Sequence, residues 1–149
     1  MTVAGAAALE GRCLCGAVRF RLIPPLGLTT HCHCQSCRLA HGAAFVTWTS
    51  VPPERFVFDA GEADVVWRRS SPGVRWGGCG RCASPMLYVA DQPHPGGVQV
   101  GAVYVSAGSL TSPLPDTPVA HVSYEEHVPW IEGAEALPKH RGKTEERIG

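Results

Sequence analysis

The stretch Cys32-His33-Cys34-Gln35-Ser36-Cys37 places three cysteines within six residues of the chain. Two cysteine pairs flank it at a distance, Cys13-Leu14-Cys15 before it and Cys79-Gly80-Arg81-Cys82 after it. Thiolates two or three residues apart on a tight turn can point at one cation, which is why such pairs recur in zinc sites. The spacing of all seven cysteines therefore predicts a domain organised around zinc, with two zinc ions per chain.

Seven sulfur ligands divide naturally into a group of four and a group of three. The two flanking pairs look alike, because each is a short turn that leads into a predicted strand. Together they would supply a tetrahedral shell from Cys13, Cys15, Cys79 and Cys82. A shell of four thiolates has no free position, so this site is predicted to be structural.

The middle cluster supplies three thiolates, those of Cys32, Cys34 and Cys37. No further cysteine remains for the fourth position, and an open position is what a catalytic zinc has, since it can take water or a substrate atom. Alternatively, a histidine closes the site. His41 or His31 is better placed for this than His33, which lies between two ligands and would have to turn back.

Three thiolates around one dication leave a net charge of about −1, which favours a nearby cation. Arg38 directly follows Cys37 and is the candidate for that role, with a solvated surface side chain as the alternative reading. The cluster could also be partly metal-free or oxidised, because exposed thiolates of low pKa oxidise readily.

Composition limits the functional class. The chain has 149 residues, 44% of them apolar and 17% charged, which suits one globular domain. Its formal net charge is +0, so we expect neither a nucleic-acid partner nor an anionic membrane. No stretch approaches the roughly 20 apolar residues that cross a bilayer, and the first ten residues lack the basic start of an export signal. We expect a cytoplasmic protein, and the sequence leaves its oligomeric state open.

Frequent glycine and proline divide the chain into short segments and predict a mainly β fold of short antiparallel sheets with little helix. One short helix is expected at residues 35–41. We expect an N-terminal arm at 1–10, the zinc-binding domain at 11–132 and a polar tail at 133–149. The strands are expected at residues 18–22, 45–49, 56–58, 65–68, 86–90, 98–105 and 119–124.

The three clusters and their neighbours resemble the glutathione-dependent formaldehyde-activating enzyme family, which also includes centromere protein V. The likeness runs from about Gly11 to Trp130 and is carried by these pieces of the sequence: Gly11-Arg12-Cys13-Leu14-Cys15-Gly16-Ala17-Val18, His31-Cys32-His33-Cys34 through Cys37-Arg38, Cys79 to Cys82 with Ser84-Pro85, Ala107-Gly108-Ser109-Leu110, and Pro118-Val119-Ala120-His121-Val122. One departure is Ala83, which stands where the family commonly has glycine.

This resemblance implies a β-tent fold with a structural zinc held by Cys13, Cys15, Cys79 and Cys82 and a catalytic zinc held by Cys32, Cys34 and Cys37. It further implies a carbon–sulfur lyase-type enzyme that acts on a small thiol such as glutathione, or on its adduct with an aldehyde such as formaldehyde. The substrate sulfur would bind the open zinc. The alternatives are a non-catalytic, zinc-stabilised binding module, which the likeness to centromere protein V allows, and a redox switch based on the middle cluster.

Overall fold

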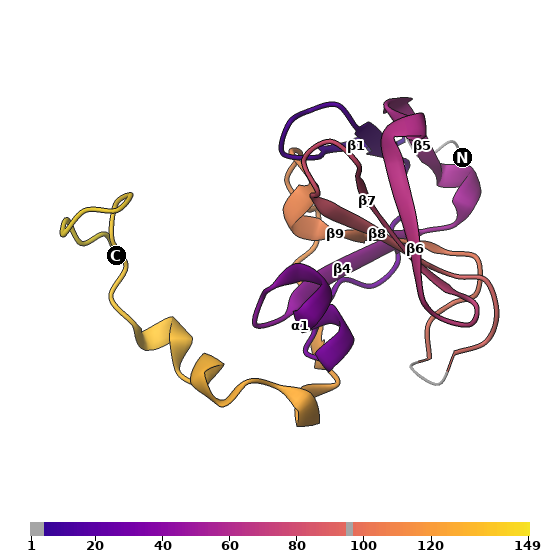
Figure 1. Ribbon diagram of the computed structural model, residues 1–149. Helices are drawn as coiled ribbons and strands as arrows, with labels where there is room; N and C mark the ends of the chain where they lie inside the picture. The colour runs from indigo at the N-terminus through magenta and orange to yellow at the C-terminus, as the bar shows by residue number, and fades with distance from the viewer. Residues whose placement is uncertain (1–4, 95–96) are drawn as a thin grey trace.

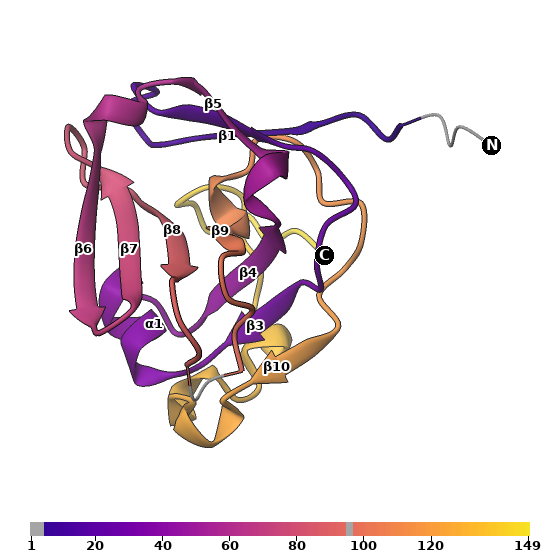
Figure 2. The same ribbon diagram turned by 90° about the vertical axis from the view of Figure 1, so that its right-hand side faces the viewer.

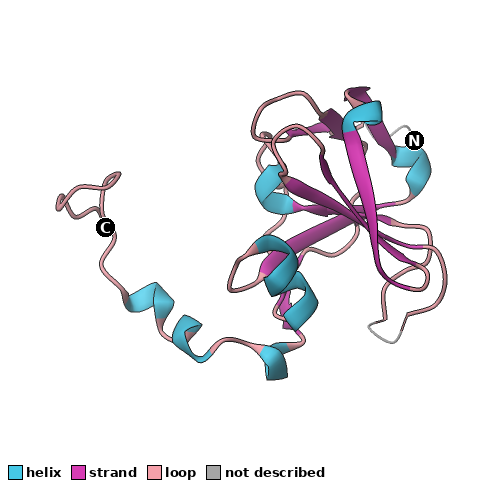
Figure 3. Cartoon of the chain, in the orientation of Figure 1, coloured by secondary structure: helices cyan, strands magenta, loops and turns pink. Residues whose placement is uncertain are grey.

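Strands dominate the computed structural model, which describes residues 5–94 and 97–149 (Figures 1 and 3). In this part of the chain a three-stranded sheet has the order β1-β2-β5, and a seven-stranded sheet has the order β10-β3-β4-β9-β8-β7-β6. Figure 2 shows the smaller sheet lying across one end of the larger one. The prediction of a mainly β fold with little helix is confirmed.

The strands of the smaller sheet are β1 (Leu9–Arg12), β2 (Arg19–Leu22) and β5 (Phe56–Ala60). Those of the larger sheet are β3 (Thr30–Cys32), β4 (Val46–Val51), β6 (Val65–Ser71), β7 (Val74–Cys79), β8 (Pro85–Ala90), β9 (Val103–Ser106) and β10 (Ala120–Val122). The α-helix is α1 (Gln35–His41). Short 3-10 turns are η1 (Pro53–Arg55), η2 (Glu62–Asp64), η3 (Ala107–Ser109), η4 (Tyr124–Glu126), η5 (Pro129–Ile131) and η6 (Ala134–Ala136).

Helix α1 spans the residues expected from the sequence, and local chemistry explains both of its ends. At its start the Cys34 side chain accepts a hydrogen bond from the backbone N–H of Cys37, which is the role of an N-cap residue. At its end Gly42 adopts the left-handed conformation (φ 58°), and its N–H bonds the carbonyl of Arg38. Seven residues make a helix too short to be stable alone, so its contacts with the sheet maintain it.

The structure adds strands that the sequence pattern did not indicate, namely β1, β3 and β7. Strand β7 ends in Gly77-Gly78-Cys79, and glycine hides the alternation on which strand prediction depends. Strand β1 begins at Leu9, so the last two residues of the expected N-terminal arm pair with β2. The strand expected at 98–105 starts only at Val103.

One strand pair departs from the antiparallel arrangement that we expected throughout. Strand β10 lies parallel to β3, with His121 opposite His31. Parallel strands need a long connection, and nearly ninety residues separate these two in the sequence. The parallel pair brings the C-terminal part of the domain beside the middle cysteine cluster.

The main core fills the space where the two sheets meet. On β2, Phe20 and Leu22 are almost fully buried, while Arg19 and Arg21 point outward as the alternation predicted. They pack with buried residues of the larger sheet, among them Met86 and Leu87. Burying each such side chain contributes roughly 1.5–3 kcal/mol, so the contact between the sheets is a substantial part of the stability.

The chain leaves the sheets after β10 (Figure 1). Residues 133–149 are exposed except for the half-buried Ala134, as fits the polar tail that we expect there. In the described part of the chain, no helix combines the length and apolarity that a membrane span requires.

Candidate metal centres

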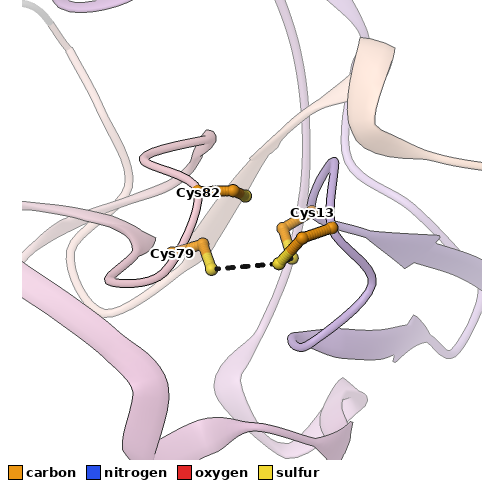
Figure 4. A group of neighbouring side chains, drawn as sticks. Cys13, Cys79 and Cys82 are labelled. Carbon is orange, nitrogen blue, oxygen red and sulfur yellow. Dashed lines mark hydrogen bonds between the residues drawn. The ribbon is translucent and has the colours of Figure 1, made fainter.

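The first candidate centre joins two turns that are far apart in the sequence. The turn between β1 and β2 carries Cys13 and Cys15, while Cys79 ends β7 and Cys82 lies on the turn that leads from β7 to β8. All four sulfur atoms lie within 4.8 Å of one another. Figure 4 shows Cys79 and Cys82 on one turn facing Cys13 on the other. The cluster therefore links the smaller sheet to the larger one.

The spacing of these sulfurs suits zinc. The Sγ atoms of Cys13 and Cys15 are 3.6 Å apart, and those of Cys15 and Cys79 are 3.9 Å apart. Four sulfurs at 2.3 Å from a tetrahedral zinc would lie about 3.8 Å from one another. The donor set and its dimensions thus fit a zinc ion.

Backbone and hydroxyl groups hold both turns in shape. The N–H of Val18 donates to Cys13 Sγ at 3.3 Å, and the N–H of Arg81 donates to Cys79 Sγ at 3.4 Å. The Ser84 hydroxyl accepts from the N–H of Leu14 on the opposite turn (2.9 Å). The Ser84 hydroxyl can therefore donate its own proton to Cys82 Sγ at 3.2 Å. This hydrogen bond helps to lower the pKa of Cys82 to about 5. Ser84 therefore links the two turns independently of any metal.

Ala83 occupies a backbone conformation that favours glycine. Its φ is +63°, and its N–H bonds the carbonyl of Cys79. The left-handed region costs a residue with a Cβ roughly 1–2 kcal/mol. A glycine, which the resemblance described above leads us to expect at this position, would adopt the same conformation without that cost.

The second candidate centre is local. Cys32 ends β3, Cys34 caps α1, and Cys37 lies in the first half of the helix. The three sulfurs lie within 4.8 Å of one another. Cys37 is buried, whereas Cys32 and Cys34 are partly accessible. One loop of six residues therefore supplies the whole cluster.

The thiols of this cluster perturb one another in a way that suits a cation. Hydrogen bonds from Cys32 and Cys37 lower the pKa of Cys34 to about 2. The same neighbours act in the opposite sense on Cys37, since contact with Cys32 and Cys34 and then burial raise the pKa of its thiol. One sulfur thus ionises at the expense of the others, and all three can be thiolates together only if a positive charge balances them.

The three histidines considered as a fourth ligand have other surroundings. His31 Nδ1 is 2.7 Å from Thr47 Oγ1, and the fully buried His33 has its Nε2 2.7 Å from His121 Nδ1. His41 packs edge-on against Trp48. In the described residues, no histidine nitrogen belongs to the group of ligand atoms that includes the three sulfurs.

His33 connects the ligand loop to the C-terminal part of the domain. Its backbone N–H bonds the carbonyl of Val122 in β10 (3.0 Å), and its ring bonds His121 in the same strand. Burial, followed by the charge of His121, lowers the pKa of His33, which favours the neutral imidazole. Further along, Tyr124 stacks on His127 with ring centroids 4.1 Å apart. Residues 120–132, here called the strap, thus support the loop that holds Cys32 and Cys34.

Arg38 acts on the loop rather than on a sulfur. Its Nε donates to the carbonyl of His33 at 3.2 Å, and its backbone N–H bonds the carbonyl of Cys34. The side chain is half-buried. Its hydrogen bond fixes the backbone between Cys32 and Cys34, and the role of its charge toward the three sulfurs stays a prediction.

Sequence reasoning missed Trp48. Its indole N–H donates to Cys37 Sγ at 3.3 Å, and both residues are buried. An aromatic group of Trp76, Tyr88 and Tyr104 packs around this pair. A tryptophan on the inward face of a predicted strand needs an acceptor for its N–H, which was the signal available in the sequence.

A cavity of about 550 Å³ runs from the four-cysteine turns to the end of α1. Its lining includes Arg12, Cys13 and Ser84 on one side and His41 and Val46 on the other. None of the three sulfurs of the second centre lines it. The cavity therefore lies between the two clusters rather than over the second one.

Comparison with known proteins identifies the family. The sequence profile of the glutathione-dependent formaldehyde-activating enzymes matches residues 8–126. The chain belongs to this family. It is 33% identical over 132 residues to a protein of Halomonas elongata provisionally named a glutathione-dependent formaldehyde-activating enzyme, covering 83% of this chain and 80% of that protein. The resemblance seen in the cysteine clusters is thereby confirmed.

The fold also matches a solved structure. A crystal structure of a Rhodobacter sphaeroides protein superposes with a TM-score of 0.57 at 18% sequence identity, covering 76% of this chain and 99% of that one. At this identity the likeness concerns the fold. The mainly β architecture of this family member is therefore shared with an experimentally determined structure.

Proposed function

We propose that this chain is a zinc-dependent enzyme that adds a small thiol to an aldehyde, as glutathione adds to formaldehyde, and that also catalyses the reverse carbon–sulfur cleavage. The observation that carries the proposal is the second centre. Three sulfurs lie together there, and the described residues bring no fourth ligand atom into the group. Membership of the family supplies the substrate class, and the residues supply a soft metal site with one position for a substrate sulfur.

Cys32, Cys34 and Cys37 would hold the zinc of this site. Bound there, zinc would supply Lewis acidity that favours the thiolate form of a thiol at the fourth position. The chain's own part is to keep the three sulfurs in place. The N–H of Cys37 does so for Cys34 Sγ at 3.3 Å, and Arg38 does so for the backbone between Cys32 and Cys34.

The proposed reaction is balanced without a redox partner. An electron pair of the substrate sulfur forms the new bond to the carbonyl carbon, and the carbonyl π pair moves onto its oxygen. The proton lost by the thiol ends on that oxygen, which gives a hydroxymethyl thioether from formaldehyde. In the reverse direction the hydroxyl loses its proton, its electron pair re-forms the carbonyl, and the carbon–sulfur bond breaks so that the sulfur leaves with that bond's pair and ends with the proton. Arg38 would support both directions by holding the loop between Cys32 and Cys34 through its bond to the His33 carbonyl.

Cys13, Cys15, Cys79 and Cys82 would hold a second zinc with a structural role. Their position at the junction of the two sheets supports this assignment, because a metal there closes a loop of more than sixty residues. The seven cysteines are all unpaired, which suits a reducing compartment such as the cytoplasm.

The test is the rate at which glutathione and formaldehyde interconvert with their adduct, measured by exchange NMR on protein purified without oxygen and carrying two zinc ions. The reaction also proceeds spontaneously, so buffer alone gives the baseline. We expect acceleration by the wild type and none by Cys34→Ser, which keeps the four-cysteine centre.

The proposal fails if the fully metallated wild type gives no acceleration with glutathione or with other small thiols and no thiol perturbs the cobalt-substituted protein. A non-catalytic, zinc-stabilised binding module would then be the better description of the chain.

A further inference from the structure

The three sulfurs of the second centre accept hydrogen bonds from different kinds of donor. Backbone N–H groups of the loop serve Cys34 and Cys32, and they come with the loop conformation itself. Cys37 Sγ instead accepts from the indole N–H of Trp48, at 3.3 Å. In the described part of the chain, the side-chain donor to these sulfurs other than the cysteines themselves is therefore Trp48.

Trp48 is held firmly in the position from which it donates. It lies on β4, outside the ligand loop, and is 7% exposed, while its acceptor Cys37 is 6% exposed. Its ring centroid is 6.1 Å from that of Trp76 and 6.0 Å from that of Tyr88, and the ring of His41 meets it edge-on at 5.3 Å. A hydrogen bond in such a dry environment is electrostatically stronger than one in water.

A donor of this kind changes what a thiolate gives to a metal. An N–H group directed at sulfur withdraws electron density from it, so the sulfur donates less to a bound cation. A dication with three thiolates already has an excess of negative charge, which opposes the approach of a fourth anionic ligand. Reducing the donation of one thiolate leaves the centre a better acceptor.

We propose that Trp48 is a positioning residue of the second centre, whose indole N–H fixes Cys37 Sγ and withdraws charge from it, so that the centre binds a soft anionic fourth ligand more tightly. The identity of that ligand as a substrate thiolate rests on the proposed function. The effect on Cys37 depends only on the hydrogen bond and on a metal at the three sulfurs.

The same aromatic group contains a matched control. Trp76 packs against Trp48 and Tyr88, but its indole N–H donates to Ser70 Oγ at 2.8 Å, in a solvent-exposed hydrogen bond. Trp76→Phe therefore removes the same atoms from the same cluster without removing a hydrogen bond to a cysteine. A purely packing role for Trp48 predicts similar consequences for Trp48→Phe and Trp76→Phe.

The experiment compares the two variants with the wild type after cobalt substitution at both centres. The first readout is the sulfur-to-cobalt charge-transfer absorption, which reports the energy of the sulfur electrons without any catalysis. We expect Trp48→Phe to move part of this absorption to longer wavelength, because Cys37 loses its donor, and Trp76→Phe to leave it unchanged. The second readout is the dissociation constant of added glutathione and of 2-mercaptoethanol, which we expect Trp48→Phe to raise about tenfold.

A charge-transfer spectrum and thiol affinities equal to those of the wild type in Trp48→Phe would overturn the inference, even if its thermal midpoint falls. If Trp48→Phe does not fold, 3-benzothienylalanine at position 48 retains the shape of the indole and replaces its N–H by sulfur, and the same two readouts decide. If Trp48→Phe shifts the spectrum but the wild type binds neither thiol, the role of Trp48 at Cys37 is supported and the proposed function is overturned.

Discussion

The two cysteine clusters have similar ligands but opposite relations to the fold. The four-cysteine cluster joins turns that are 64 residues apart, with one turn in each sheet. The three-cysteine cluster comes from one loop and the helix that follows it. A metal in the first cluster closes a long loop, whereas a metal in the second only stiffens a short one. The comparison teaches that the sequence separation of the ligands, rather than their chemistry, decides how much the fold depends on the metal. A cluster on which the fold does not depend is free to have a reactive role.

The largest effect that this comparison predicts is on folding. Cys79→Ser should lose the metal of the four-cysteine cluster and unfold or aggregate, because structural zinc contributes on the order of 10 kcal/mol of apparent binding energy in small domains. Cys34→Ser, at the other cluster, should lose one of two zinc ions and remain folded. Thermal melting measures the stability of both variants, and metal analysis measures their zinc content. A Cys79→Ser protein with the thermal midpoint of the wild type would show that the fold does not depend on the four-cysteine cluster.

The next effect is on the pH dependence of zinc affinity at the second centre. Its neighbours hold the pKa of Cys34 at about 2, so this sulfur is ionised near neutral pH, while the pKa values of Cys32 and Cys37 are raised and their thiols stay protonated. Zinc must then displace about two protons, so its affinity should fall about 100-fold for each unit by which the pH drops near neutrality.

Competition titration with a chelator of known affinity, at several pH values, gives this slope for the wild type. Cys79→Ser cannot serve as the control because of its expected instability, so the difference between wild type and Cys34→Ser isolates the second centre. A slope near zero would mean that the thiols are already ionised without metal.

A smaller effect concerns the strap. His121→Phe keeps an aromatic ring beside His31 and Phe45 but removes the partner of the buried His33. Loosening the loop between two ligands should speed zinc release from the second centre about tenfold. His127→Phe keeps aromatic contacts with Tyr124 and His33 and loses only hydrogen bonds to Tyr124 and Glu132, so it should release zinc at the wild-type rate.

Zinc transfer to a colorimetric chelator should show a fast phase from the second centre and a slow phase from the four-cysteine cluster. Only the fast phase should change in His121→Phe. Equal acceleration of both phases would show that the strap stabilises the whole domain rather than this centre.

The smallest effect lies at the four-cysteine cluster. Ala83→Gly should raise the free energy of unfolding by at most about 1 kcal/mol, because relief of the left-handed strain exceeds the added flexibility of the unfolded chain only slightly. Denaturant unfolding of the zinc-loaded protein measures the change. The same substitution at Ala43, which has no positive φ, is the control and should be neutral or destabilising. Destabilisation by Ala83→Gly would mean that the turn tolerates alanine without strain.

The sequence alone determined the chemistry of both clusters and the type of fold. Seven cysteines in three groups indicate soft metal sites wherever the chain places them, and the alternation of Val18, Phe20 and Leu22 with arginines predicts a half-buried strand in any context. Helix α1 was also predictable, because its cap and its final glycine are local signals. These features depend on residues within a few positions of one another.

Only the tertiary structure decided which groups surround those sulfurs. The bond from Trp48 to Cys37 and the support of His33 by His121 join residues whose separations range from 11 to 88 positions. Strand β7 appears only when its glycines pack closely against neighbouring strands, and β10 lies parallel to β3 only because the intervening sheet brings the chain back. Such contacts depend on the free energy of packing the whole domain, which no short stretch of sequence contains.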